Sequence, residues 1–86
     1  MKSASPIIMS QQETLAWIAQ LFEVPTDKVT SETDRIDIPA WDSLGVLVLM
    51  AGLDTDFGVI LSDDEVSSMN KVNDILEILR ARGKVT

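Results

Sequence analysis

The chain has 86 residues, with 7 basic and 14 acidic side chains and a formal net charge of −7. A chain of this length forms one domain with a small core, which argues against a deep enzyme cleft. It contains no cysteine and no histidine, so the sequence offers no disulfide, no thiolate and no imidazole base. The negative charge argues against nucleic acid as a partner and favours a basic protein surface.

Residues 1–9 hold a short apolar patch but neither the apolar run nor the cleavage pattern of a signal peptide. The uncharged stretch from Ser43 to Leu53 is shorter than the roughly 20 residues that cross a bilayer. We therefore expect a cytoplasmic, soluble monomer without a membrane span. The expected division is a flexible arm over residues 1–9, a helical bundle over residues 10–83 and a tail over residues 84–86.

The first expected helix opens at Ser10. Ser10 and Glu13 have the spacing of a capping box, in which each side chain bonds the backbone N–H of the other residue. The helix should run to about Phe22, because Pro25 pushes the residue before it out of the helical region. Its predicted core stripe, at helical spacing, is Leu15, Ile18, Ala19 and Phe22.

A long acidic connection over residues 23–41 comes next. Its three expected anchors to the core are Val29, Ile36 and Ile38. Because only a few apolar residues interrupt this polar stretch, we predict a loop rather than a further helix.

The second expected helix, from Ser43 to about Phe57, carries two apolar stripes. The stripe that stays apolar to the end of the helix is assigned to the core: Val46, Leu49, Met50, Leu53 and Phe57. The other stripe consists of Leu44, Leu47, Val48 and Ala51. This second stripe is either an exposed docking patch or is covered by the long loop or by residues 1–9.

Two shorter segments complete the predicted fold. Ser62 and Glu65 form a second capping box, for a short helix through about Met69. Asn70 is predicted to cap a last helix that ends near Arg82, before Gly83. The core stripe of that helix is Val72, Ile75, Leu76 and Leu79. No stretch alternates as a strand would, so the predicted fold class is all-α, a small four-helix bundle with a short third helix.

The motif Asp42-Ser43-Leu44 stands about halfway along this acidic helical chain. With the segments 21–25 and 29–30, 53–59 and 69–72, it makes the chain resemble an acyl carrier protein, of the phosphopantetheine-binding carrier family. The likeness covers roughly residues 12–79. The three-residue motif is weak by itself, and its place in the chain makes the combined pattern specific.

The resemblance implies that the chain is a carrier and not an enzyme. Ser43 would be esterified by 4′-phosphopantetheine, which a phosphopantetheinyl transferase moves from coenzyme A with the help of a divalent metal. Acyl-loading and acyl-accepting enzymes would then exchange cargo as a thioester on this arm. Asp42 matches the acidic residue that the family places beside the transferase and its metal, and it can also simply cap the helix.

The family also suggests a cleft for acyl cargo between the second and third helices. The residues in position to line it are Val46, Met50, Leu53 and Met69. Each sheltered methylene would gain about 0.8 kcal/mol. The alternative is that these four side chains only pack in the core.

The chain departs from housekeeping carriers near the motif, where it has Trp41, Gly45 and Val48 instead of a small residue and carboxylates. The predicted partner surface is therefore apolar: Trp41, Leu44, Leu47, Val48 and Ala51. Such an apolar surface favours a role in a specialised lipid, polyketide or polysaccharide-modification pathway over one in general fatty acid biosynthesis. An aminoacyl, peptidyl or D-alanyl carrier is the alternative within the family.

Three hypotheses from other functional classes remain: a calcium-binding loop, an interaction bundle and a hydrolase. Residues 54–65 have acids where a calcium loop needs them, but Gly58 and Val59 occupy positions that require a ligand and a glycine. A helical interaction bundle without a prosthetic group would never be modified at Ser43. Hydrolysis at Ser43 lacks a positioned base other than Asp42.

Overall fold

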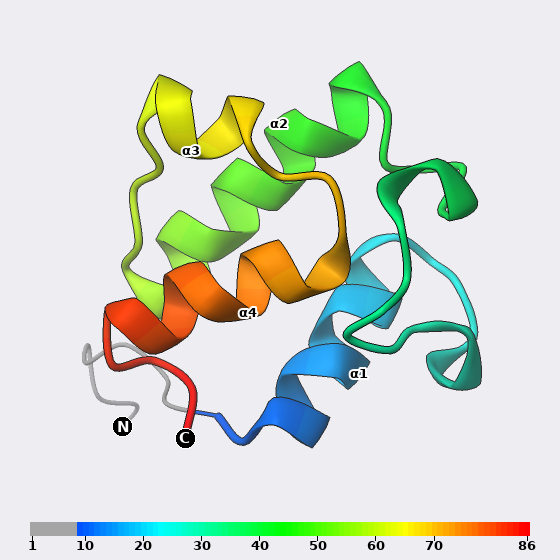
Figure 1. The fold of residues 1–86 in the computed structure, drawn as a ribbon, viewed down its shortest axis with the longest axis horizontal. Coiled ribbons are helices and arrows are strands. Elements are labelled where there is room, and N and C mark those ends of the chain that lie inside the picture. The colour runs from blue at the N-terminus through cyan, green and yellow to red at the C-terminus, as the bar shows by residue number, and fades with distance from the viewer. Residues whose placement is uncertain (1–8) are drawn as a thin grey trace.

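A computed structural model describes residues 9–86, as a bundle of four α-helices (Figure 1). Residues 1–8 of the predicted arm lie outside the described residues. The helices are α1 (Gln11–Leu21), α2 (Ser43–Gly52), α3 (Asp63–Ser67) and α4 (Val72–Ala81). Short 3₁₀ turns at Thr26–Lys28 (η1) and Arg35–Asp37 (η2) interrupt the loop between α1 and α2. The predicted all-α bundle with a long first loop and a short third helix is confirmed.

Both predicted capping boxes are present. The backbone N–H of Glu13 donates to Ser10 Oγ at 3.1 Å, and the N–H of Ser10 donates to Glu13 Oε1 at 2.9 Å. At α3 the N–H of Glu65 donates to Ser62 Oγ at 3.2 Å, and the N–H of Ser62 donates to Glu65 Oε1 at 2.9 Å. Each box satisfies two N–H groups that a helix start leaves without a partner, so α1 and α3 begin where the sequence predicts.

The start of α4 differs from the prediction. The residue flanking the helix is Lys71, not Asn70. The carboxylate of Asp74 reaches back instead, and its Oδ2 accepts from the N–H groups of Asn70 (2.8 Å) and Lys71 (3.1 Å). One carboxylate thus replaces the predicted asparagine cap, while Gly83 ends the helix in the left-handed conformation as predicted, with φ 71°.

The helix that begins at Ser43 continues beyond α2 as one turn of π-helix, Leu53–Phe57 (η3). Gly58 then adopts φ 68°, and the N–H of Val59 closes the wide turn on the carbonyl of Leu53 at 3.1 Å. The predicted end at Phe57 is therefore confirmed. Among the helices within residues 9–86, none is long and apolar enough to cross a membrane.

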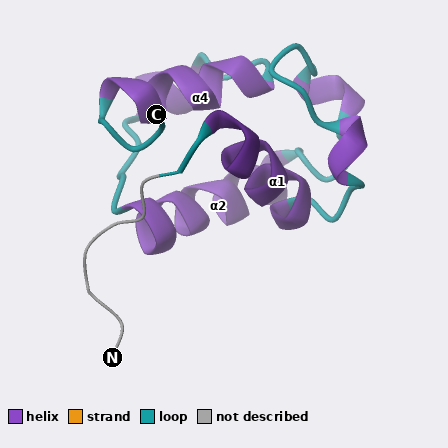
Figure 2. Cartoon of the chain, turned by 90° about the horizontal axis from the view of Figure 1, so that it is seen from below, coloured by secondary structure: helices purple, strands orange, loops and turns teal. Residues whose placement is uncertain are grey.

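The core lies between α1, α2 and α4, which pack side by side (Figure 2). α2 and η3 contribute Leu49, Leu53 and Phe57, all with 0% exposure. Val46 and Met50 are partly buried against this core. The buried stripe of α4 is the predicted one: Val72, Ile75, Leu76 and Leu79.

α1 buries the predicted Ile18 and Ala19, and the predicted Phe22 is buried directly after its end, whereas Leu15 is only partly buried. Thr14 is fully buried as well, which the apolar pattern could not indicate. Its hydroxyl donates to the carbonyl of Ser10 at 2.8 Å, so the helix itself satisfies the polar atom that Thr14 brings into the core.

The last residues pair with the beginning of the described chain. The N–H of Met9 donates to the carbonyl of Lys84 at 3.0 Å, and the N–H of Thr86 donates to the carbonyl of Met9 at 2.9 Å. Val85 is 7% exposed and belongs to the core. The predicted boundaries at residues 9 and 83 stay predictions, but the bundle holds Met9 and the tail in place.

One predicted anchor of the long loop is wrong. Val29 and Ile38 are each 3% exposed, as expected, but Ile36 is 89% exposed. Ile36 lies in the middle of the turn η2, whose tight backbone directs successive side chains to different sides. Ile38, just after the turn, points into the core and Ile36 points into solvent.

Glu65 links α3 to the end of α4. Its carboxylate accepts from Arg82 Nη2 at 2.7 and 2.9 Å. Hydrogen bonding from the Ser62 backbone, helped by the Arg82 charge, lowers the pKa of Glu65 below its ordinary 4.5. A lowered pKa in the folded state stabilises the fold above the unfolded pKa, and this stabilisation disappears as the pH falls through the folded pKa.

We therefore expect Glu65→Gln to reduce the Tm at neutral pH and to matter less and less below pH 4.5. Thermal unfolding of both proteins across a pH series measures this convergence. A Tm difference that persists unchanged into strongly acidic solution would show that the loss comes from helix capping geometry rather than from the carboxylate charge.

Candidate functional site

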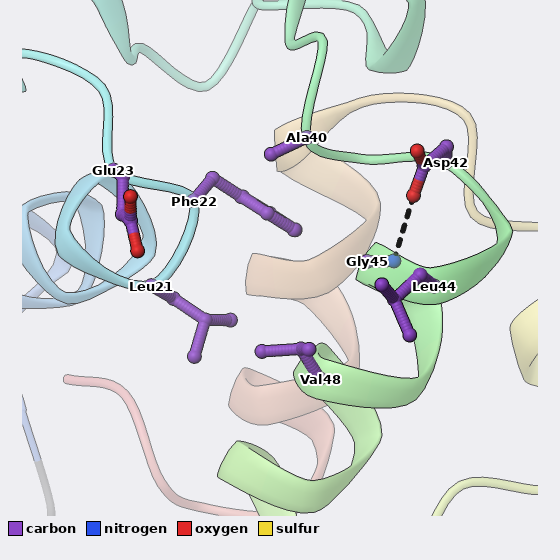
Figure 3. A pocket seen from close by; sticks show the side chains of 8 residues that line it. All are labelled: Leu21, Phe22, Glu23, Ala40, Asp42, Leu44, Gly45 and Val48. Carbon is purple, nitrogen blue, oxygen red and sulfur yellow. Dashed lines mark hydrogen bonds between the residues drawn. The ribbon is translucent and has the colours of Figure 1, made fainter.

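Ser43 is the first residue of α2 and is exposed. Asp42 caps the helix, because its Oδ1 accepts from the N–H of Gly45 at 2.9 Å (Figure 3). Within residues 9–86 the Ser43 hydroxyl has no hydrogen-bond partner. Asp42 thus meets the capping requirement, and the Ser43 hydroxyl, which no residue of 9–86 bonds, lies at the positive end of the α2 dipole.

The backbone just before Ser43 lies unusually close to α2. A Cβ placed on Gly45 would come within 1.8 Å of the carbonyl oxygen of Ala40 and 2.9 Å of its carbonyl carbon. Only glycine fits at this position. Gly45 therefore allows the loop to pass close to the helix and so sets how the loop approaches the serine. From the sequence, Gly45 is notable only because housekeeping carriers have carboxylates in this region.

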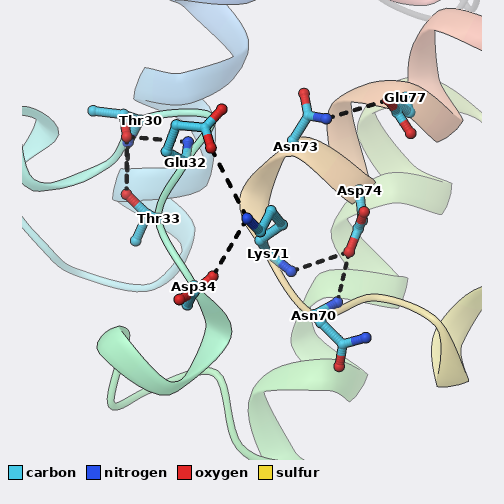
Figure 4. A network of polar contacts seen from close by, with 9 residues as sticks. All are labelled: Thr30, Glu32, Thr33, Asp34, Asn70, Lys71, Asn73, Asp74 and Glu77. Atoms are coloured by element: carbon cyan, nitrogen blue, oxygen red, sulfur yellow. Dashed lines mark hydrogen bonds and ion pairs between the residues drawn. The ribbon is translucent and has the colours of Figure 1, made fainter.

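The long loop is tied to the start of α4 (Figure 4). The N–H of Arg35 donates to the carbonyl of Asn70 at 2.8 Å, and the N–H of Val72 donates to the carbonyl of Thr33 at 2.9 Å. Lys71 Nζ lies 3.8 Å from Asp34 and 3.9 Å from a Glu32 oxygen. These exposed ion pairs add little energy, so the backbone hydrogen bonds are what hold this part of the loop.

Trp41, predicted for the partner surface, is buried at 3% exposure, so this assignment is wrong. Its ring stacks on Phe22 with centroids 5.5 Å apart and planes at 18°. Arg35 lies 6.0 Å from the ring centroid, and its Nε donates to the Trp41 carbonyl at 3.0 Å. The side chain buries a large apolar area, and its Nε1 has no hydrogen-bond partner in the described structure.

The rest of the predicted partner surface is exposed. Leu44 is 69% exposed, Leu47 61% and Val48 42%, and Ala51 is also exposed. These four residues form one face of α2, next to Ser43, and we call them the α2 patch. Neither the loop nor the described end of the chain covers the α2 patch, and its use for docking stays a prediction.

The residues predicted to line an acyl cleft lie in or against the core. Leu53 is 0% exposed and Met69 1%. Val46 and Met50 are partly buried and pack on the same cluster. In this structure the four side chains pack as core residues, and the cleft between α2 and α3 stays a prediction.

A hollow of about 360 Å³ lies between the end of α1 and the start of α2. We call it the α1–α2 hollow. Residues 21–23, Ala40 and Asp42 line it together with Leu44, Gly45 and Val48. In Figure 3 the side chains of Leu21 and Val48 point toward each other across it. Sequence reasoning missed this hollow, because it depends on how α1 and α2 pack.

Glu23, on the wall of the hollow, has a left-handed backbone with φ 57°. It follows the α1 cap, where its neighbour Val24 donates to the carbonyl of Ala19 at 2.9 Å. Glycine is the usual residue at such a helix end, and any other residue costs roughly 1–2 kcal/mol there. The Glu23 carboxylate has no partner within residues 9–86.

Two acidic residues of the hypothetical calcium loop make other contacts. Asp56 Oδ2 accepts from Trp17 Nε1 at 2.7 Å, and Glu65 pairs with Arg82. In the described part of the chain, no three acidic side chains are grouped as a metal ion would require. The structure thus does not support the hypothesis that residues 54–65 bind calcium.

Comparison with known proteins gives distant relatives among the acyl carrier proteins. The chain is 31% identical over 67 residues to the acyl carrier protein homolog of Mycoplasmopsis pulmonis, covering 78% of this chain and 90% of that protein. The chain belongs to the acyl carrier protein family. The acyl carrier proteins of Rickettsia canadensis and Rickettsia felis are each 22% identical over 72 residues, covering 84% of both chains. No protein-family model matches.

Membership of the acyl carrier protein family makes this chain a carrier protein and not an enzyme. The names of these relatives specify no particular acyl group and no partner enzyme.

Proposed function

We propose that this carrier protein holds an acyl group as a thioester on a 4′-phosphopantetheine arm attached to Ser43. The observation that carries the proposal is the exposed hydroxyl of Ser43 at the first position of α2, which no residue of 9–86 bonds. The family membership supports the same prosthetic group. When bound, the arm supplies the thiol that the cysteine-free sequence lacks.

The residues around Ser43 fit such a group. The start of a helix favours a phosphodiester, because the dipole is positive there and the first N–H groups point outward. Asp42 uses Oδ1 for the cap, which leaves its other carboxylate oxygen toward solvent and toward a transferase with its metal. Gly45 and the ties of the long loop keep the serine accessible.

We further propose that partner enzymes dock on the α2 patch. Its apolar side chains, exposed by 42–69% for the three large ones, would gain about 25 cal/mol for each Å² that a partner covers. A surface steered by carboxylates would instead weaken sharply with salt. The apolar patch favours a dedicated partner, in a specialised lipid, polyketide or polysaccharide-modification pathway.

Incubation with coenzyme A and a broad-specificity phosphopantetheinyl transferase tests the proposed attachment. We expect the intact mass to rise by one phosphopantetheine. Ser43→Ala should show no increase, while Ser67→Ala, which removes an exposed serine of α3, should be modified like the parent. An unmodified parent chain would contradict the carrier mechanism at Ser43, provided that the transferase modifies another carrier in the same assay.

A further inference from the structure

The α1–α2 hollow begins at the attachment serine. The two residues that flank Ser43 in the chain, Asp42 and Leu44, both line the hollow. A group attached to Ser43 therefore starts at its rim and reaches it without crossing the core. The cleft predicted between α2 and α3 would instead require the packed side chains of Leu53 and Met69 to separate.

The lining combines apolar surface with hydrogen-bond acceptors, and Glu23 is one of them. Leu21, Leu44 and Val48 provide the apolar walls. Glu23 provides a carboxylate that no described residue bonds, held there by an unfavourable backbone conformation. Residues kept in strained conformations gather at functional sites. A ligand with both methyl groups and hydrogen-bond donors matches this combination.

The pantetheine part of the arm has this chemistry, with two methyl groups, a hydroxyl and two amide N–H groups. Its extended length is comparable to that of a peptide of four or five residues, roughly 16 Å. From Ser43, at about 1.5 Å per helical residue, this length spans most of α2. A second hollow of about 210 Å³, lined by Trp17, Gln20, Leu21 and Asp56, continues past Leu21.

The geometry points to the α1–α2 hollow as the resting place of the arm. The hydroxyl or an amide N–H of the arm donates to Glu23, and the thiol end lies near Leu21. Because the arm stays on the surface, the core need not open. This inference rests on the proposed attachment at Ser43 and adds a location for the arm.

Methyl NMR of the unmodified and the arm-bearing protein, labelled at Leu, Val and Met, tests the location. We expect the signals of Leu21 and Val48 to shift on attachment and those of Met50 and Met69 to stay. Shifts at Met50 and Met69 without Leu21 and Val48 would place the arm in the core. Shifts confined to Leu44, beside Ser43, would mean a free arm; both results would overturn the inference.

Thiol reactivity gives a second test, since the arm carries the only thiol of the modified protein. We expect Val48→Gln to speed alkylation of this thiol by about fourfold, the factor for losing one buried methylene. Ile60→Gln is the matched control, because Ile60 is 75% exposed and lies outside the hollow. Equal rates in the parent and Val48→Gln would overturn the inference.

Glu23→Gly separates a structural role from a binding role. Glycine relieves the left-handed strain, so the Tm should rise. If Glu23 also holds the arm, alkylation should become faster in the same variant; a raised Tm with unchanged alkylation would contradict the hydrogen bond. Intact mass keeps the two proposals apart: absence of the arm contradicts the attachment itself, whereas an attached arm without these effects contradicts only its location.

Discussion

Replacing Phe57 with alanine is expected to lower the free energy of unfolding by about 3–5 kcal/mol. Phe57 is 0% exposed and meets Trp17 edge to face, with ring centroids 5.0 Å apart. It ends the π-helical turn, so the cavity left by its ring would lie where the helix from Ser43 closes onto α1. Because small domains have only about 5–15 kcal/mol of stability, this single change should remove a large part of it.

Urea unfolding followed by circular dichroism measures the loss. Ile36→Ala is the matched control, because Ile36 is also a large apolar residue but is 89% exposed; we expect its effect to stay within about 0.5 kcal/mol. A near-neutral Phe57→Ala would contradict the assignment of the two α2 stripes. A costly Ile36→Ala would instead show that η2 packs against the bundle.

The helices could be predicted because their signals are local. Capping boxes at Ser10 and Ser62 need only residues three positions apart, and both appear where the spacing places them. The apolar repeats of α2 and α4 likewise follow from helix geometry alone. The end of the second helix at Phe57 could also be read, although its last turn is π-helical.

The loop could not be predicted with the same success, because its geometry depends on distant residues. The turn η2, which directs Ile36 into solvent, is held by a hydrogen bond from the backbone of Arg35 to Asn70, 35 residues further along the chain. Trp41 enters the core because Phe22 stacks on it. The size and apolar surface of Trp41 already indicate burial. The family pattern instead places Trp41 on the partner surface, and that assignment is wrong.

For the candidate site, the sequence indicates the serine and the exposed face of α2 but not the hollow beside them. The spacing of Leu44, Leu47 and Val48 marks a surplus apolar face, and all three are exposed. The α1–α2 hollow joins residues 21–23 to the start of α2 across a loop of about 20 residues. The apolar periodicity within each segment does not show that residues 21–23 lie beside the start of α2. Their proximity arises only when the two helices pack.

Gly45→Ala is expected to destabilise the protein by about 1–3 kcal/mol, as overpacking does. The added methyl carbon would lie 1.8 Å from the Ala40 carbonyl oxygen. That oxygen belongs to backbone, and the loop around it is fixed by the buried ring of Trp41. The loop must therefore move away from α2 at the point that presents Ser43, and the rate of arm transfer should fall together with the Tm.

Gly52→Ala is the matched control, since both glycines lie within α2 and both gain helix propensity from alanine, about 1 kcal/mol. At Gly52 the nearest atoms are side-chain carbons of Trp17 at 3.0 Å and Leu21 at 3.2 Å. These side chains have to shift by a few tenths of an ångström, which offsets the gain in helix propensity, so the Tm of Gly52→Ala should change little and arm transfer should proceed at the parent rate. If instead Gly45→Ala is as stable and as readily modified as Gly52→Ala, the contact between Ala40 and Gly45 does not position the serine.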